Sequence, residues 1–93
     1  MLAVDVVKRG GERPSESFER IKLERSIRAA LLSVRTPDGQ AEDTARRVTD
    51  IVEQWLAEHN EVTSYDIRLR ASGALEQLHP DAAYLYKHHK VIM

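Results

Sequence analysis

Apolar residues recur every three or four positions along most of the chain after residue 19, and this spacing predicts that helices dominate the fold. A first helix is expected to begin near Glu19, with a buried face formed by Leu23, Ile27, Ala30, Leu31 and Val34. It is expected to end at the turn sequence TPDGQ, residues 36–40. A second helix is expected over about residues 41–59, with an apolar stripe formed by Ala45, Val48, Val52, Trp55 and Leu56.

Two further helices are predicted in the second half of the chain. Thr63 or Ser64 can cap a helix over about residues 65–78, and Asp66 is favourable in its first turn. The positions expected to point inward on this helix are Ile67, Ala71, Ala74, Leu75 and Leu78. Pro80 breaks the pattern because proline lacks an amide donor. A fourth helix is expected over about residues 81–90, carrying Ala83, Leu85, Tyr86 and a basic end.

Short strands are predicted at the N-terminus and before the third helix. Residues 2–9 are rich in valine and partly alternate, and Gly10 and Gly11 mark a turn. The returning segment contains Pro14, which favours an edge or bulged strand, and the backbone near Val62 is expected to be strand-like. The expected fold is therefore α+β and mostly α. It is a single domain over residues 1–93, in which a small four-helix bundle is capped by a short two- or three-stranded sheet.

Composition narrows the classes of function. The 93 residues include no cysteine, which excludes disulfides, cysteine-based zinc sites and a thiol nucleophile. The 14 Lys and Arg against 15 Asp and Glu give a net charge of −1, which counts against a nucleic-acid partner. No apolar run approaches the roughly 20 residues that span a bilayer, and the first residues do not resemble a secretory signal. We expect a soluble, cytoplasmic protein without a membrane partner.

Catalysis and metal binding have no visible signature. No nucleophile stands beside a base, and the serines fall in caps and turns. His88 and His89 are adjacent, so on a helix they point about 100° apart and make a poor ligand pair. Surface or capping roles are expected for these two residues and for His59 and His79. We therefore expect no enzymatic activity and no metal site.

Basic residues around the first turn suggest an anion site. The sequence contains neither a P-loop nor a GxGxxG motif. However, Lys8 and Arg9 end the first predicted strand, and Lys22 lies one turn into the following helix. A hairpin folded over the start of that helix brings the three cations together, where they can hold phosphate with help from helix amides.

Neighbouring residues complete this predicted site. The apolar ones, Val6, Phe18 and Leu23, can form a seat for a purine. Glu16 can accept a hydrogen bond from an amine or a ribose hydroxyl, and Ser64 offers a hydroxyl and an amide at the start of the third helix. In the alternative interpretation the cations are solvated and the apolar residues belong to the core. Spacing alone leaves both interpretations open.

The order of these segments resembles the ATP-cone domain. The resemblance is carried by VVKRGG, ESFERIKLERSIRAAL, VTSYDI and HPDAAYLYKHH, and it covers nearly the whole chain. The stretch from Phe18 to Ile27 is the most specific part. The family has a three-stranded β-cap over a four-helix bundle and binds ATP or dATP as a regulatory ligand. It occurs in ribonucleotide reductase large subunits and in the bacterial repressor of the genes for that enzyme.

The resemblance also implies a site. Val6 and Leu23 correspond to residues that lie against the base, and Lys22 corresponds to a lysine that approaches the phosphates. Arg68 stands at a position that often faces phosphates. The nine residues of the implied site are Val6, Lys8, Arg9, Glu16, Phe18, Lys22, Leu23, Ser64 and Arg68.

The function implied by the resemblance is regulation without catalysis. Such a module binds ATP or dATP and has no catalytic cofactor; whether Mg²⁺ accompanies the nucleotide is left open. It acts by a nucleotide-dependent change of conformation or oligomeric state. Self-association or a protein partner is expected. Trp55, Tyr84 and Tyr86 are candidates for the contact surface, with a core role favoured for Trp55. Gly10 stands where the family usually has aspartate, and the turn is longer than in common members. The alternative is therefore a degenerate cone that serves as a protein–protein interaction or oligomerisation module.

Overall fold

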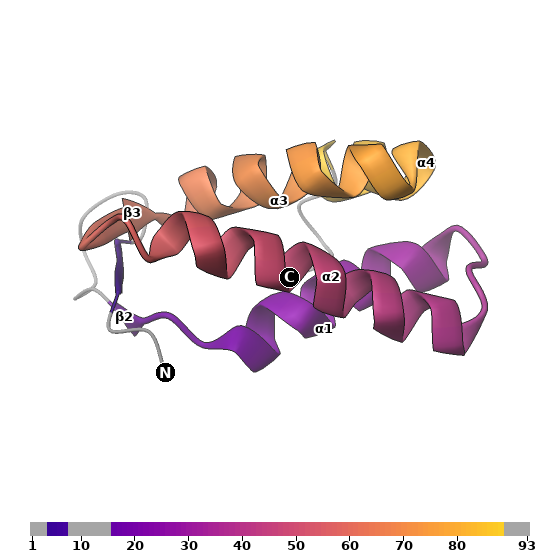
Figure 1. The fold of residues 1–93 in the computed structure, drawn as a ribbon. Helices are drawn as coiled ribbons and strands as arrows, with labels where there is room; N and C mark the ends of the chain where they lie inside the picture. Colours follow the sequence, from indigo (N-terminus) through magenta and orange to yellow (C-terminus); the bar gives the residue numbers. More distant parts are fainter. Residues whose placement is uncertain (1–3, 8–15, 89–93) are drawn as a thin grey trace.

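The computed structural model describes residues 4–7 and 16–88 of the chain. These residues form, in order, β1 (Asp5–Val7), β2 (Glu16–Ser17), α1 (Arg20–Ser33), α2 (Asp38–Leu56), β3 (Glu61–Thr63), α3 (Ser64–Leu78) and α4 (Pro80–His88). The helices pack against one another as a bundle, and the sheet lies at one end of it (Figure 1). The predicted small, mainly helical fold with four helices is confirmed. None of the helices in the described ranges is both long and apolar enough to cross a lipid bilayer.

The second helix begins and ends earlier than the sequence predicted. It starts at Asp38 because Pro37, with φ of −56°, is already set for helix entry, and an acidic side chain is favourable in the first turn. It ends at Leu56. There the carbonyl oxygen of Trp55 accepts from the amide of Glu58 at 3.2 Å and from the ring Nδ1 of His59 at 2.9 Å, and these two contacts close the helix end.

The first helix ends in a tight left-handed turn. Arg35 has φ of 62°, a conformation that favours glycine. The amide of Thr36 donates to the carbonyl of Leu31 at 3.1 Å, and the amide of Arg35 donates to that of Leu32 at 3.0 Å. This pair of bonds is the Schellman arrangement, which closes the helix end and turns the chain toward α2.

The three strands form one sheet with β1 in the middle. β1 is antiparallel to β2, where Val6 lies opposite Glu16, and parallel to β3, where Val6 lies opposite Val62. The amide of Phe18 donates to the carbonyl of Val4 at 2.8 Å, which extends the contact between β1 and β2 toward α1. The sheet therefore joins the first residues of the described chain to the entrances of α1 and α3.

The core runs through the bundle, and two predictions about exposure are wrong. Leu78 was expected to point inward, but its side chain is 44% exposed because it ends α3 at an open face between α2 and α3. Tyr86 was a candidate surface residue, but it is only 2% exposed because it packs between α1 and α3. Tyr84 is exposed, and Trp55 is half-buried against the core.

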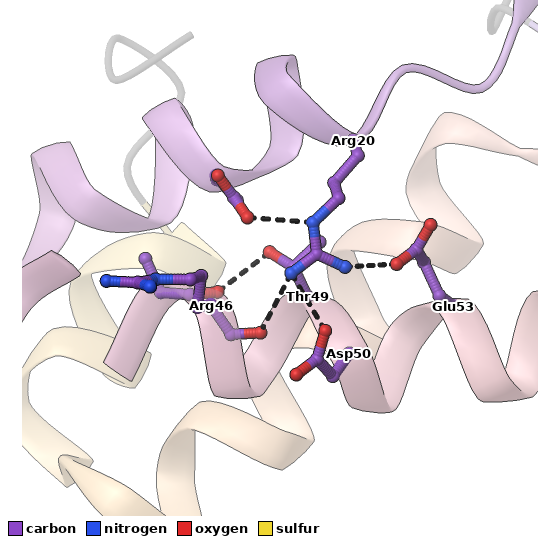
Figure 2. A network of polar contacts seen from close by, with 7 residues as sticks. Arg20, Arg46, Thr49, Asp50 and Glu53 are labelled. Carbon is purple, nitrogen blue, oxygen red and sulfur yellow. Dashed lines mark hydrogen bonds and ion pairs between the residues drawn. The ribbon is translucent and has the colours of Figure 1, made fainter. Parts of the chain in front are cut away.

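A charged network fixes the start of α1 against α2. The guanidinium of Arg20 binds Asp50 at 2.8 Å and Glu24 at 2.8 Å, contacts Glu53, and reaches the carbonyl of Arg46 at 3.5 Å (Figure 2). Burial acts to lower the pKa of Arg20, but the hydrogen bonds that it donates to its carboxylate partners outweigh burial and raise that pKa above its ordinary value. Arg20 therefore stays charged and holds the first turn of α1 in place.

Candidate functional site

A small hollow lies where the sheet meets the starts of α1 and α3. Its volume is about 130 Å³, and we call it the cap hollow. It is lined by Val6, Ser17, Phe18, Glu19, Lys22, Leu23, Ser64 and Ile67. Five of the nine residues that the sequence assigned to the site, namely Val6, Phe18, Lys22, Leu23 and Ser64, therefore meet around one cavity.

The wall of the cap hollow is apolar. Val6 comes from β1, Phe18 from the segment before α1, Leu23 from α1 and Ile67 from α3. Each of these side chains is 7–8% exposed, whereas Ile27, one turn further along α1, is fully buried. The wall residues are thus part of the core and also present an edge to the hollow. The interpretation that these residues belong to the core is confirmed, and their role as a seat for a purine stays a prediction.

The rim of the cap hollow is polar and carries a lysine. The Nζ of Lys22 lies 3.7 Å from Oε2 of Glu19, and both side chains are well exposed. Glu19 occupies the N-cap position of α1, but its side chain makes no capping hydrogen bond to the described backbone. The first amides of α1 and the positive end of its dipole therefore lie beside Lys22. A helix start of this kind attracts anions.

The start of α3 is capped by Thr63, one of the two residues that the sequence offered for this role. The cap is Thr63, whose Oγ1 accepts from the amide of Asp66 at 3.0 Å, and the carboxylate of Asp66 accepts from the amide of Thr63 at 3.1 Å. This reciprocal pair is a capping box. Ser64 is the first helical residue rather than the N-cap. It remains on the lining of the cap hollow.

Arg68 does not line the cap hollow. Its Nη1 donates to the carbonyl oxygen of Tyr86 at 2.9 Å, and its guanidinium carbon lies 5.2 Å from the centre of the Tyr86 ring. The hydroxyls of Tyr86 and Ser26 are 3.0 Å apart. Burial raises the pKa of the Tyr86 phenol, although the hydrogen bond with Ser26 and the charge of Arg68 oppose the shift. Arg68 thus joins α3 to α4 and is not among the residues that line the hollow.

Three predicted residues are only partly covered by the structure. Lys8 and Arg9 lie outside the described residues. The backbone of Glu16 is part of β2 and pairs with Val6, but its side chain is not described. The placement of these three side chains stays a prediction.

Sequence reasoning missed three lining residues, Ser17, Glu19 and Ile67. Ile67 was assigned to the inward face of the third helix, and its spacing of three from Ser64 places both on one side of that helix. Glu19 stands three residues before Lys22, which is the spacing of an ion pair on a helix. Both spacings can be read from the sequence. That these residues lie near Val6 follows only from the folded structure, in which β1 carries Val6 to the starts of α1 and α3.

A polar cluster around His79 has a structural role. His79 accepts the amide of Ala82 on Nδ1 at 3.3 Å, and its Nε2 lies 3.3 Å from Oγ1 of Thr36, so it caps α4 and holds the turn between α1 and α2. Within residues 4–7 and 16–88, no group of three histidine or acidic side chains is arranged to hold a metal ion.

Comparison with known proteins gives no assignment. No protein-family model matches the sequence, and no curated protein matches it. The resemblance to the ATP-cone therefore depends on the residues named above and on where the fold places them.

Proposed function

We propose that this chain is a regulatory module that binds ATP or dATP at the cap hollow and performs no chemistry. The observation that carries the proposal is that Val6, Phe18, Lys22, Leu23 and Ser64, which come from three separate segments of the sequence, line one cavity. In this proposal the adenine lies against the apolar wall, and the phosphates lie at the rim near Lys22 and the first amides of α1. The turn residues Lys8 and Arg9 are proposed to supply the remaining positive charge.

The size of the cap hollow supports a complex in which the adenine is enclosed and the phosphates stay at the rim. Its volume of about 130 Å³ is well below the roughly 300–1,000 Å³ that is usual for sites enclosing a whole ligand. Only one part of a nucleotide can therefore be enclosed. Burying the heterocycle and leaving the charged groups at the rim avoids the cost of desolvating phosphate.

The position of the cap hollow supports a regulatory mechanism. Its lining includes residues of β1, β2, α1 and α3, so a ligand in it contacts the sheet and two helices at once. A nucleotide that binds one arrangement of these elements more tightly shifts the population toward that arrangement. The change can then be passed to a partner or to a second copy of the chain.

A second candidate function is a cone-like module that has lost its ligand and acts only through its helix faces. The small volume of the cap hollow favours this candidate, and so does the capping of α3 by Thr63, which leaves fewer amides available there. The two candidates share one fold and differ in whether nucleotide binds.

Calorimetric titration of the purified chain with ATP and with dATP distinguishes the two candidates. Under the first, heat saturates, and Lys22→Ala weakens binding about tenfold or more because a charge-assisted contact to phosphate is lost. Lys87→Ala is the matched control, since Lys87 is an exposed lysine on α4 outside the cap hollow. The nucleotide affinity of this variant should equal that of the original chain. No saturable heat at about millimolar nucleotide would leave only the second candidate.

A further inference from the structure

A second, larger depression lies between α2 and α3. We call it the α2–α3 groove; its volume is about 870 Å³. Three of its lining residues, Ile51, Leu69 and Leu78, are large apolar side chains that are 38–44% exposed. Trp55 lies half-buried on the same lining. No part of the described chain covers these side chains, so the groove is an apolar surface without an occupant from residues 4–7 and 16–88.

Gly73 lies on the lining of this groove, in the middle of α3. Glycine is among the least favourable residues inside a helix, so a glycine there calls for a reason. The chain's own packing does not supply one, because a Cβ at Gly73 would meet no atom within 4 Å. A glycine lets the backbone of a second helix approach closely. The open space at Gly73 is therefore what a docked helix would need.

The groove lining carries two arginines and two aspartates, and three of these four side chains form an ion pair or a hydrogen bond with other described residues. Arg47 forms an ion pair within α2. Asp50 is bound by the arginine that begins α1, and the carboxylate of Asp66 accepts from the amide of Thr63. The guanidinium of Arg70 lies 5.2 Å from the centre of the Trp55 ring, and none of the described carboxylates forms an ion pair with it. The groove thus presents, beside an aromatic ring, an arginine that forms no ion pair with any described carboxylate.

We propose that the α2–α3 groove binds an amphipathic helix of a protein partner. The apolar stripe of that helix packs on Leu69 and its neighbours, its backbone passes over Gly73, and an acidic side chain on its edge pairs with Arg70. Helices bind to apolar grooves in this way through anchors at positions i, i+3, i+4 and i+7. The groove and the cap hollow share no lining residue, so this proposal stands apart from nucleotide binding.

Two synthetic helical peptides test the proposal. Both carry the same leucine stripe and no aromatic residue, and they differ only in having glutamate or lysine along its edges. Trp55 is the only tryptophan of the chain and lines the groove, so its fluorescence reports binding directly. We expect the glutamate peptide to bind about tenfold more tightly than the lysine peptide, with the difference shrinking at high salt.

Three variants locate the binding. Gly73→Gln should weaken binding of the glutamate peptide about tenfold or more, because the new side chain occupies the space over α3 that the peptide backbone needs. Arg70→Glu should reverse the preference between the two peptides. Ile21→Gln is the control, because Ile21 is an exposed apolar residue on α1 outside the groove. Far-ultraviolet circular dichroism of each variant checks that the helices remain.

Two outcomes would overturn the proposal. One is equal binding of both peptides, or binding of neither. The other is a stable dimer of the full chain in sedimentation that Gly73→Gln dissociates, because the groove would then be occupied by a second copy rather than by a partner helix.

Discussion

The phenol of Tyr86 and the hydroxyl of Ser26 lie 3.0 Å apart and join α4 to α1 across the bundle. The phenol is buried, and burial raises its pKa above the ordinary value of 10.0. In the unfolded chain the phenol ionises near that ordinary value, whereas in the folded chain it keeps its proton to higher pH. Between the two values the unfolded state has lost a proton that the native state retains, so stability falls as pH rises.

Tyr86→Phe should therefore change the alkaline limb of the stability curve. At neutral pH we expect a loss of about 1 kcal/mol, because the hydrogen bond with Ser26 is removed. As the pH rises past 10.0, the ordinary pKa of the phenol, the variant should lose less stability than the original chain, because the buried group no longer titrates. Urea unfolding across this range checks the prediction. Parallel curves for the two proteins would contradict it.

Arg20→Gln should destabilise the fold through loss of the network with Asp50, Glu53 and Glu24. We expect about 1 kcal/mol rather than more, because the side chains are partly exposed and solvent screens them. Arg47→Gln is the matched control. It removes a single exposed pair with Asp43 and should cost roughly 0.5 kcal/mol or less. Chemical denaturation in low and high salt measures both effects, and an equal cost for the two variants would show that the network has no additional effect.

Arg35→Gly should stabilise the protein. Arg35 adopts a left-handed conformation, with φ of 62°, at the end of α1, where glycine has no Cβ penalty. We expect a gain of about 0.5–1 kcal/mol after the entropy of glycine in the unfolded chain is taken into account. Thermal and urea unfolding measure the change, and Arg35→Ala, which keeps a Cβ, should not produce the gain.

Thr63→Ala and Ser64→Ala form a pair that separates capping from ligand contact. Thr63→Ala removes the capping box with Asp66 and should cost about 1 kcal/mol of stability. Ser64→Ala keeps that box and should change stability by no more than roughly 0.5 kcal/mol. If the proposed site is correct, Ser64→Ala lowers nucleotide affinity measured by calorimetry. The interpretation of the α3 cap fails if Ser64→Ala is the more destabilising of the two.

Glu19→Gln should tighten nucleotide binding at the cap hollow several-fold. Its carboxylate lies 3.7 Å from the ammonium of Lys22, and in the proposed complex it also lies near the phosphates. Removing the negative charge relieves repulsion of the ligand, and the effect should fade as salt is raised. Calorimetry at two salt concentrations tests this. A loss of affinity would mean that Glu19 supports the site instead.

The sequence predicted the helices well because their signals are local. The apolar spacing around Ile27 and Val48 determines the inner faces of α1 and α2, and Pro80 marks the break before α4. The errors occur where tertiary packing decides. Leu78 follows the inward spacing of α3 but faces the open groove. Tyr86 was a candidate surface residue, but it is buried because α4 packs against α1 and α3.

The candidate site was predictable only in part, and for the same reason. The apolar wall follows from Val6, Phe18 and Leu23, which the sequence singled out. Arg68 could not be placed, since nothing local indicates that its guanidinium would bind the carbonyl of Tyr86 on another helix. The roles of Thr63 and Ser64 were left open because both residue types cap helices, and only the backbone geometry distinguishes them.

The cap hollow is complete only when β1 is paired in parallel with β3. Val6 takes its place only when a strand from the beginning of the chain lies beside one that follows two complete helices. A fragment that begins at α1 would keep the segments that form all four helices and lack four of the eight lining residues, namely Val6, Ser17, Phe18 and Glu19. Any molecule that fits there should therefore protect the whole chain against proteolysis and leave such a fragment as vulnerable as before.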